Sequence, residues 1–298
     1  MSYQEKNIKN IVDHLLGQKQ SNNSFNFINQ DDIINIILEL NKIIFFEYFY
    51  NDYKHSLKNY LSIKIQEISY NLSKQIAKVL KYLPNFSTST EEELFYKGQE
   101  LSLKFLEKLP KIQALLKTDL QATFDSDPAA YNKVEIVCAY PGLFAIMVNR
   151  VAHELYLLNV PILPRIMTEY AHAKTGIDIH PGATLGKYFF IDHGTGIVIG
   201  ETAILGNNVK IYQGVTIGAL STRGGHKLYG KKRHPTIEDN VIIYAGASIL
   251  GGETVIGKNC VIGGNVFVTS SIPENTKVSL KNQELELNFV NSKAYKKQ

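Results

Sequence analysis

The chain has 298 residues, of which 44% are hydrophobic and 20% are charged, and its formal net charge is +4. This length allows two folded units with a substantial core, and the composition is ordinary for a soluble globular protein. The charge is too small, and the basic residues too dispersed, to make nucleic acid the expected partner.

The cysteine content and the N-terminal segment indicate in which cellular compartment the protein is expected. Two cysteines, Cys138 and Cys260, are too few for a disulfide framework. Residues 1–20 are polar and lack the apolar core of a signal peptide. The most apolar stretch, residues 33–50, is interrupted by charged and amide side chains, so it is not a membrane span. We therefore expect a cytoplasmic protein.

The first 170 residues carry a helical pattern, with aliphatic side chains recurring at intervals of three and four. Asp31 and Asp32 can cap the first helix, and the sequence Thr90-Glu91-Glu92-Glu93 is typical of a capping box. We predict an all-α N-terminal domain over residues 1–170, with helical segments at 33–44, 57–83, 90–110, 111–124 and 143–158.

From Ile177 to Val268 the sequence repeats every six residues. Its aliphatic positions include Ile179, Leu185, Ile191 and Ile197, and after a slip of two residues Ile199, Leu205, Ile211 and Ile217. Six fits neither a helix nor a heptad, but it suits short strands separated by tight corners. Stacked coils of this kind bury a continuous aliphatic column. We therefore predict an α+β protein, in which a left-handed parallel β-helix over 171–275 follows the helical domain and precedes a C-terminal tail over 276–298.

One insertion interrupts the repeats, between Ala219 and Arg233, and it contains Gly224-Gly225 and several charged residues. A solenoid tolerates an insertion at a corner, and such loops often line the binding face. We expect this loop to border a ligand site.

Asp178 and His193 are candidates for acid–base chemistry, because they lie about one coil apart and could face each other across adjacent coils. An aspartate that holds one imidazole nitrogen leaves the other nitrogen free to take a proton. The alternative is that both are corner residues whose side chains satisfy turn backbone, as aspartate commonly does. The spacing alone leaves both interpretations open.

Two further motifs are weaker when taken alone. Arg233-His234 ends the inserted loop, and a guanidinium beside an imidazole suits a carboxylate ligand. A solvated basic loop explains that pair equally simply. Asp127-Pro128 lies between predicted helices, where it is typical of a turn or a helix start.

Taken together, these motifs are far more specific. They are Thr118-Asp119-Leu120, Asp127-Pro128-Ala129, Tyr140-Pro141-Gly142-Leu143, Arg150–Leu155, Asp178–Ala183, Asp192–Ala203 and Lys232–Ile237. The hexapeptide pattern alone indicates acyltransferases in general. Asp-Ile-His-Pro joined to Asp-His-Gly-Thr-Gly-Ile and Arg-His-Pro resembles the serine O-acetyltransferase family, over about residues 118–279.

The resemblance implies transfer of acetyl from acetyl-CoA to the hydroxyl of L-serine, giving O-acetyl-L-serine and CoA in cysteine biosynthesis. It implies that His193 is the general base and that Asp178 orients it. The implied serine-binding residues are Asp127 and Asp192 for the ammonium group, Arg233 and His234 for the carboxylate, and Glu201 at the pocket edge. The implied coenzyme contacts, mainly through backbone, are Ala219, Gly224, Gly225, Ala245 and Gly264. Acetyl-CoA would be a co-substrate, and no metal is expected.

The resemblance also implies a homo-oligomer, either a trimer or a dimer of trimers, and competitive inhibition by L-cysteine. Members of the family that bind the sulfhydrylase use a C-terminal isoleucine, whereas this sequence ends in Lys297-Gln298. We therefore expect no sulfhydrylase complex, and neither nucleic acid nor membrane as a partner.

Three alternatives stay open at this point. One is a hexapeptide acetyltransferase with another hydroxyl acceptor, such as homoserine or a sugar. Another is a γ-class carbonic anhydrase, with zinc held by histidines from among His180, His193, His226 and His234. The third is a non-catalytic homologue, but such a protein would have lost His193 or Asp178, and both are present.

Overall fold

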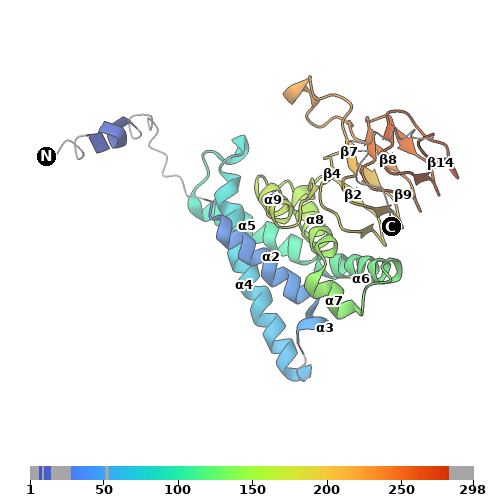
Figure 1. The fold of residues 1–298 in the computed structure, drawn as a ribbon. Helices are drawn as coiled ribbons and strands as arrows, with labels where there is room; N and C mark the ends of the chain where they lie inside the picture. Colours follow the sequence, from blue (N-terminus) through green and yellow to red (C-terminus); the bar gives the residue numbers. More distant parts are fainter. Residues whose placement is uncertain (1–6, 9, 15–27, 51–53, 282–298) are drawn as a thin grey trace.

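The structure is a computed structural model that describes residues 7–8, 10–14, 28–50 and 54–281 (Figure 1). Its first half is helical and its second half is a parallel β-helix. The helical elements are α2 (Gln30–Ile44), α3 (Phe46–Phe49), α4 (Lys54–Leu80), η1 (Pro84–Phe86), α5 (Glu91–Leu106), α6 (Leu109–Ser126), α7 (Lys133–Ala139), α8 (Pro141–Leu157) and α9 (Leu163–Thr175).

The predicted helix starts are partly right. The capping box at Thr90 is confirmed, because its side chain accepts from the Glu93 amide while the Glu93 carboxylate accepts from the Thr90 amide. The cap predicted for α2 is wrong: Asn29 caps this helix by accepting from the Asp31 amide at 3.0 Å. Asp31 and Asp32 instead lie in the first turn, where the helix dipole favours negative charge.

Helix α9 was not predicted, and it moves the change from helix to strand beyond residue 170. Pro164 lies in the first turn of α9, where a proline starts a helix instead of breaking it. The helix ends at Gly176, which adopts a left-handed conformation with φ of 72°. The first strand begins at the next residue.

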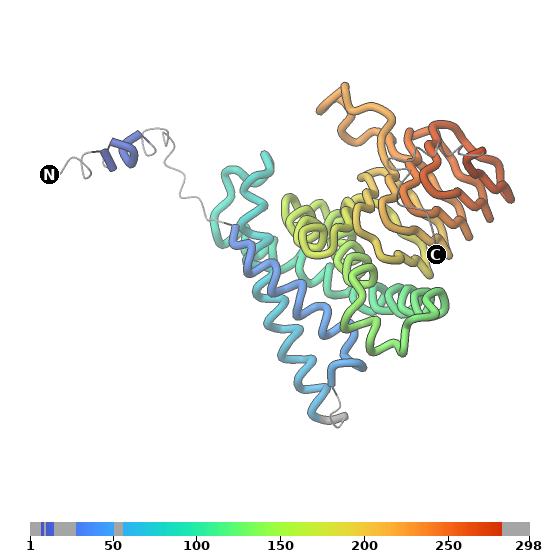
Figure 2. Tube along the Cα trace, viewed as in Figure 1, coloured from blue at the N-terminus to red at the C-terminus, as the bar shows by residue number. Residues whose placement is uncertain are grey.

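The second half winds in stacked coils (Figure 2) whose strands form three parallel sheets. Each of the first four coils contributes one strand to each sheet, and the fifth contributes a strand to two of them and a single bridge residue, Ile272, to the third. Sheet A contains β1 (Ile177–Ile179), β4 (Ile197–Ile199), β7 (Thr216–Gly218), β10 (Ser248–Leu250) and β13 (Phe267–Val268). Sheet B contains β2 (Thr184–Leu185), β5 (Ile204–Leu205), β8 (Thr236–Ile237) and β11 (Val255–Ile256). Sheet C contains β3 (Phe190–Ile191), β6 (Lys210–Ile211), β9 (Ile242–Ile243), β12 (Val261–Ile262) and β14 (Lys277–Val278).

The predicted aliphatic column is the core of these coils. Ile179, Ile199 and Ile217 pair in register along sheet A, and all three side chains are buried. Cys260, which occupies a small-residue position of the repeat, is also fully buried. The predicted fold class, a helical domain followed by a parallel β-helix, is confirmed.

Two parts of the chain lie outside the regular coils predicted from the repeats. The inserted loop leaves the coils between β7 and β8, contains the short helix η2 (Gly225–Leu228), and projects away from the β-helix (Figure 1). Strand β14 pairs with β12, so the last coil extends into the predicted C-terminal tail. The rest of that tail, residues 282–298, lies outside the described residues.

A buried ion pair joins the two halves. Arg150 on α8 donates to both carboxylate oxygens of Asp119 on α6, at 2.7 and 2.9 Å. The same guanidinium donates to the carbonyl oxygens of Leu185 and Gly186, and Asp119 accepts from the Phe189 amide. Helices α6, α8 and α9 thereby cover the first coil, as terminal caps do in repeat proteins.

Within the described ranges, no single helix has both the length and the hydropathy that a membrane span needs. Helices α7 and α8 meet these criteria only jointly, and they bend by 70° where they join.

Candidate active site

One group of predicted site residues gathers at the corner between sheets A and B, which we call the AB corner. Here the turn Glu201-Thr202 lies beside Arg233-His234, which is at the same place on the next coil. Strand β5 pairs with β8 in a register that matches Ile204 with Thr236. The same offset joins Glu201 to Arg233 and Thr202 to His234.

His234 is held in a defined orientation at the AB corner. Its Nδ1 accepts a hydrogen bond from the Thr202 amide at 3.0 Å, and the Thr202 hydroxyl lies 2.8 Å from the same atom. The side chain is buried, and burial, helped by the charge of Arg233, lowers the pKa of His234 to about 4. The imidazole is therefore neutral at pH 7 and suited to hydrogen bonding.

Arg233 is held by Glu201 through a direct ion pair. Glu201 also accepts from the phenol of Tyr156 on α8, at 2.9 Å. Burial alone would raise the pKa of Glu201, but the hydrogen bonds from Arg233 and Tyr156 hold it below its usual range. A charged guanidinium is thereby fixed beside the neutral imidazole of His234, an arrangement that suits a carboxylate ligand.

His180 lies close to this network. Its ring contacts Tyr156 edge to face, with centroids 6.0 Å apart, and its Nδ1 accepts from the Gly182 amide at 3.0 Å. Burial and the charge of Arg165 lower the pKa of His180. His180 is therefore a second neutral imidazole near the AB corner.

A second group lies at the corner between sheets C and A, which we call the CA corner. Asp192 and His193 follow β3 in the turn that leads to β4. The His193 side chain is 71% exposed, and its Nδ1 lies 3.7 Å from an Asp192 carboxylate oxygen. His193 has a φ of 56°, a left-handed conformation that is uncommon for a residue other than glycine.

Asp127 and the CA-corner residue Asp192 both influence the phenol of Tyr140. The Tyr140 phenol donates to Asp127 at 2.7 Å, and the second Asp127 oxygen accepts from the Ala129 amide at 2.8 Å. The hydrogen bond to Asp127 is the main cause that raises the pKa of Tyr140 to about 12, and the charge of Asp192 adds to it. The two aspartates thus act on one phenol, in a negative environment that suits a ligand ammonium group.

Asp178 and His193 do not meet within this chain. Asp178 is on β1 in sheet A, and its ion-pair partner is Arg165 on α9, at 4.0 Å. Among the described residues, no hydrogen bond or ion pair joins Asp178 to His193. The contact expected from their spacing is therefore not made within a single chain.

The predicted coenzyme residues are divided between the two corners. Ala245 and Gly264 follow strands β9 and β12, so they lie in turns at the CA corner. Ala219, Gly224 and Gly225 belong to the loop that starts at the AB corner. Gly264 has little room for a side chain, because a Cβ there would approach the Ala245 carbonyl oxygen to 3.1 Å.

Potential metal ligands converge elsewhere. In the described part of the chain, one group of side chains has metal-binding geometry: Glu169, His172 and Asp178. It includes none of the four histidines considered for zinc, and Arg165 pairs with both of its carboxylates. This arrangement gives no support to a zinc site of the carbonic-anhydrase type within one chain.

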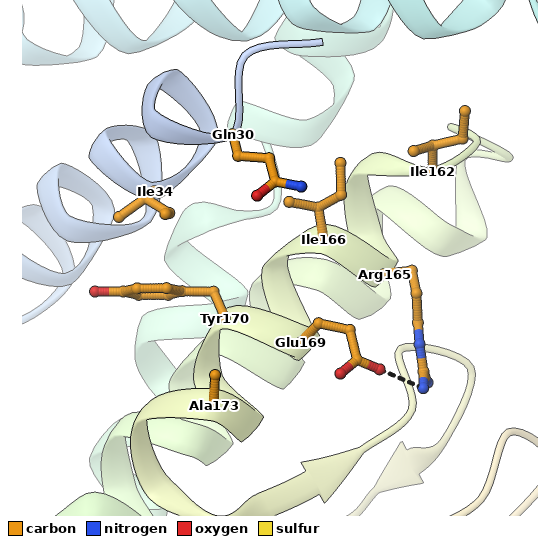
Figure 3. A pocket seen from close by; sticks show the side chains of 8 residues that line it. All are labelled: Gln30, Ile34, Ile162, Arg165, Ile166, Glu169, Tyr170 and Ala173. Carbon is orange, nitrogen blue, oxygen red and sulfur yellow. Dashed lines mark ion pairs between the residues drawn. The ribbon is translucent and has the colours of Figure 1, made fainter. Parts of the chain in front are cut away.

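A cavity of about 580 Å³ lies outside both corners, between α2 and α9 (Figure 3). Ile34, Ile166 and Tyr170 line it, and the Arg165–Glu169 ion pair lies at its edge. The cavity contains none of the residues predicted to bind serine or the coenzyme.

Sequence reasoning assigned no role to Thr202, Tyr156 or Tyr140. Tyr140 and Thr202 both belong to the family motifs, but the contact of Tyr140 with Asp127 depends on how α7 and α8 pack against α6, whose C-cap residue is Asp127. The position of Thr202 beside His234 follows from the strand register, which gives Glu201-Thr202 and Arg233-His234 a common offset. The inserted loop separates the two pairs in the sequence and hides this offset.

The fold and these two groups of side chains define a hexapeptide-repeat acyltransferase. No family model matches the chain. It is 44% identical over 215 residues to a plasmid-encoded serine acetyltransferase of Synechococcus elongatus, covering 70% of this chain and 67% of that protein. It is 48% identical over 137 residues to the serine acetyltransferase of Bacillus subtilis, covering 46% and 60%.

Solved structures agree. Serine acetyltransferase isoform 3 of Entamoeba histolytica, in complex with cysteine, superposes with a TM-score of 0.71 at 36% identity, covering 85% of this chain and 84% of that one. The Neisseria gonorrhoeae enzyme in complex with serine gives a TM-score of 0.55 at 28% identity, covering 88% and 100%. The chain belongs to the serine acetyltransferase family.

Proposed function

We propose that this chain transfers the acetyl group of acetyl-CoA to the hydroxyl of L-serine, releasing O-acetyl-L-serine and CoA. The observation that carries the proposal is the placement of charged side chains at the two corners. Arg233, held by Glu201, stands beside a neutral His234 at one corner, and Asp127 and Asp192 both act on the Tyr140 phenol near the other. An amino acid presents one carboxylate and one ammonium group, and these two groups of side chains complement them.

The chemistry follows from His193. Its imidazole removes the serine hydroxyl proton while the oxygen attacks the thioester carbonyl carbon. The carbon–sulfur bond then breaks, and the CoA thiolate takes the proton back from the imidazolium. Asp178 orients the ring and stabilises its charged form. Holding both substrates together supplies much of the rate by proximity, and neither cysteine is needed as a nucleophile.

We infer that the complete site forms between two copies of the chain, in a trimer or a dimer of trimers. The AB and CA corners lie at opposite ends of the strands of sheet A, so one chain does not bring them together. A head-to-tail cyclic interface would put the CA corner of one copy against the AB corner of the next. His193 would then reach Asp178, Arg233 and His234 of the neighbouring copy.

The predicted coenzyme residues support this assembly. They are divided between the two corners, and a groove between two copies would unite them. On the outer face of sheet A, Val198 and Phe267 are 38% and 67% exposed, with the polar Thr216 and Ser248 between them in the strand register.

We further propose that L-cysteine inhibits the enzyme competitively with L-serine. Cysteine has the same ammonium and carboxylate groups, and it carries a thiol in place of the hydroxyl. Two Entamoeba histolytica serine acetyltransferases of similar fold have been solved with cysteine bound. The thiol would lie against His193, in the position of the reacting oxygen.

A steady-state assay tests these proposals. Loss of the acetyl-CoA thioester is followed with serine, with homoserine and with buffer alone. We expect serine-dependent turnover, and a higher rate with homoserine would overturn the assignment of the acceptor. Titrating cysteine at several serine concentrations should raise the apparent KM for serine only. Inhibition competitive with acetyl-CoA alone would exclude the proposed cysteine site.

A further inference from the structure

We propose that Thr202 is a positioning residue for the substrate carboxylate site, because it sets the backbone of Arg233-His234 and fixes the tautomer of His234. This inference rests on the proposed function. It adds Thr202 as the residue that orients Arg233 and His234 for the substrate carboxylate. Thr202 lies on the coil before that pair, in the turn between β4 and β5.

The hydroxyl of Thr202 organises the backbone at the end of the inserted loop. Its Oγ1 accepts from the Arg233 amide at 2.9 Å and from the His234 amide at 3.1 Å. The Thr202 carbonyl oxygen also accepts from the Lys232 ammonium group at 2.7 Å. Three successive residues of the loop end are therefore held by one threonine.

The Thr202 amide determines where the His234 ring carries its proton. A backbone N–H can only donate, so the His234 Nδ1, 3.0 Å away, must accept. A neutral imidazole that accepts at Nδ1 carries its hydrogen on Nε2. The Thr202 hydroxyl, 2.8 Å from Nδ1, reinforces the same tautomer because it too can donate.

The proton on Nε2 is available to a ligand. Among the described residues, the Nε2 atom of His234 has no hydrogen-bond partner. It is accessible, because the described side-chain polar atom that is fully buried without a partner belongs to Gln75. Arg233 lies next to it in the chain and is itself held by Glu201. A carboxylate at this corner would therefore meet a guanidinium and an N–H donor that are oriented before it binds.

The coil does not depend on the Thr202 side chain to close. Main-chain hydrogen bonds link the two coils on both sides of the turn, from Gly200 to Ile217 and from Ile204 to Pro235. Removing the hydroxyl should therefore leave the β-helix intact and act mainly on Arg233 and His234.

The experiment uses the full chain with Thr202→Val, which keeps the shape and removes the hydroxyl, and Thr202→Ser, which keeps the hydroxyl. Thr184→Val is the control, because Thr184 is exposed on β2 and makes no side-chain hydrogen bond among the described residues. The KM values for serine and acetyl-CoA are measured for each. We expect Thr202→Val to raise the serine KM by roughly tenfold or more, with little change for acetyl-CoA, and Thr202→Ser to restore it.

Nitrogen-15 NMR of histidine-labelled protein supplies a second readout, with His234→Gln used to assign the signals. We expect the wild-type His234 ring to be protonated at Nε2, and Thr202→Val to shift that tautomer balance. A wild-type ring protonated at Nδ1 would overturn the proposal even if Thr202→Val failed to fold. An unchanged serine KM in folded Thr202→Val would overturn it as well. Absence of serine turnover in the wild type would instead count against the proposed function and leave the tautomer result to stand by itself.

Discussion

The imidazole of His234 lies against Gly200, so closely that a Cβ on residue 200 would come within 2.0 Å of Cδ2 and 2.1 Å of Nε2. Real atoms do not approach to this distance, so any side chain at residue 200 must displace the ring. The ring is thereby confined between Gly200 and the turn that contains Thr202.

Gly200→Ala should therefore weaken serine binding while the coils stay folded. We expect the serine KM to rise by roughly tenfold or more, because His234 leaves its place beside Arg233. Gly218→Ala is the matched control on sheet A, since its Cβ would meet only the ends of the Leu250 and Thr216 side chains. An unchanged serine KM in Gly200→Ala would mean that the ring position does not matter for binding.

His193→Asn should nearly abolish serine-dependent release of CoA. Asparagine keeps the polarity of the corner but has no basic nitrogen, and general-base assistance is typically worth about 10²–10⁴ in rate. His14→Asn is the control, because His14 is exposed in the described N-terminal segment 10–14 and belongs to neither corner. Retention of more than about a tenth of the activity by folded His193→Asn would refute the assignment of the base.

Two inactive variants should complement each other if the site forms between copies. Chains with His193→Asn are co-expressed with chains carrying Arg233→Ala, so that some interfaces combine two intact corners. Random cyclic trimers would recover about a quarter of the wild-type activity. His193→Asn mixed with Asp192→Asn is the control, because both changes are at the CA corner and no interface becomes intact. Equal recovery in the two mixtures would contradict an inter-copy site.

Burial of His234 should make the protein sensitive to acid. Its pKa falls from 6.5 to about 4 on folding, so between these values the unfolded state binds more protons. The stabilising contribution is complete above pH 6.5 and is lost as the pH falls toward 4. Urea unfolding at several pH values should show a smaller loss of unfolding free energy in His234→Gln than in the wild type. Parallel pH profiles for the two proteins would argue against a buried neutral ring.

The Arg150–Asp119 pair should be essential for joining the two halves. Asp119→Ala leaves a buried guanidinium without its partner, which typically costs about 3–5 kcal/mol in unfolding free energy. Glu100→Ala serves as control, because Glu100 pairs with Lys97 and Lys104 on an exposed helix surface, where solvent screening makes such pairs contribute little. Similar losses in the two variants, measured by urea unfolding, would show that the pair is not a structural anchor.

The sequence alone determined the architecture of the second half and the identity of the chemical groups. A six-residue period places one side chain of each strand in the interior of the coil. The buried positions Ile179, Ile199 and Ile217 therefore follow from local spacing. The family motifs likewise singled out His193, Arg233 and His234. Short-range patterns were less informative in the helical half, where they did not reveal α9.

Only the tertiary structure decided which of these groups meet. The inserted loop hides the register between consecutive coils, so the contacts of Glu201 with Arg233 and of Thr202 with His234 appear only after the strands pair. The turns themselves are local, but the distance between the AB and CA corners is a property of the closed coil. For that reason Asp178 and His193, about one coil apart in sequence, bind different partners within the chain.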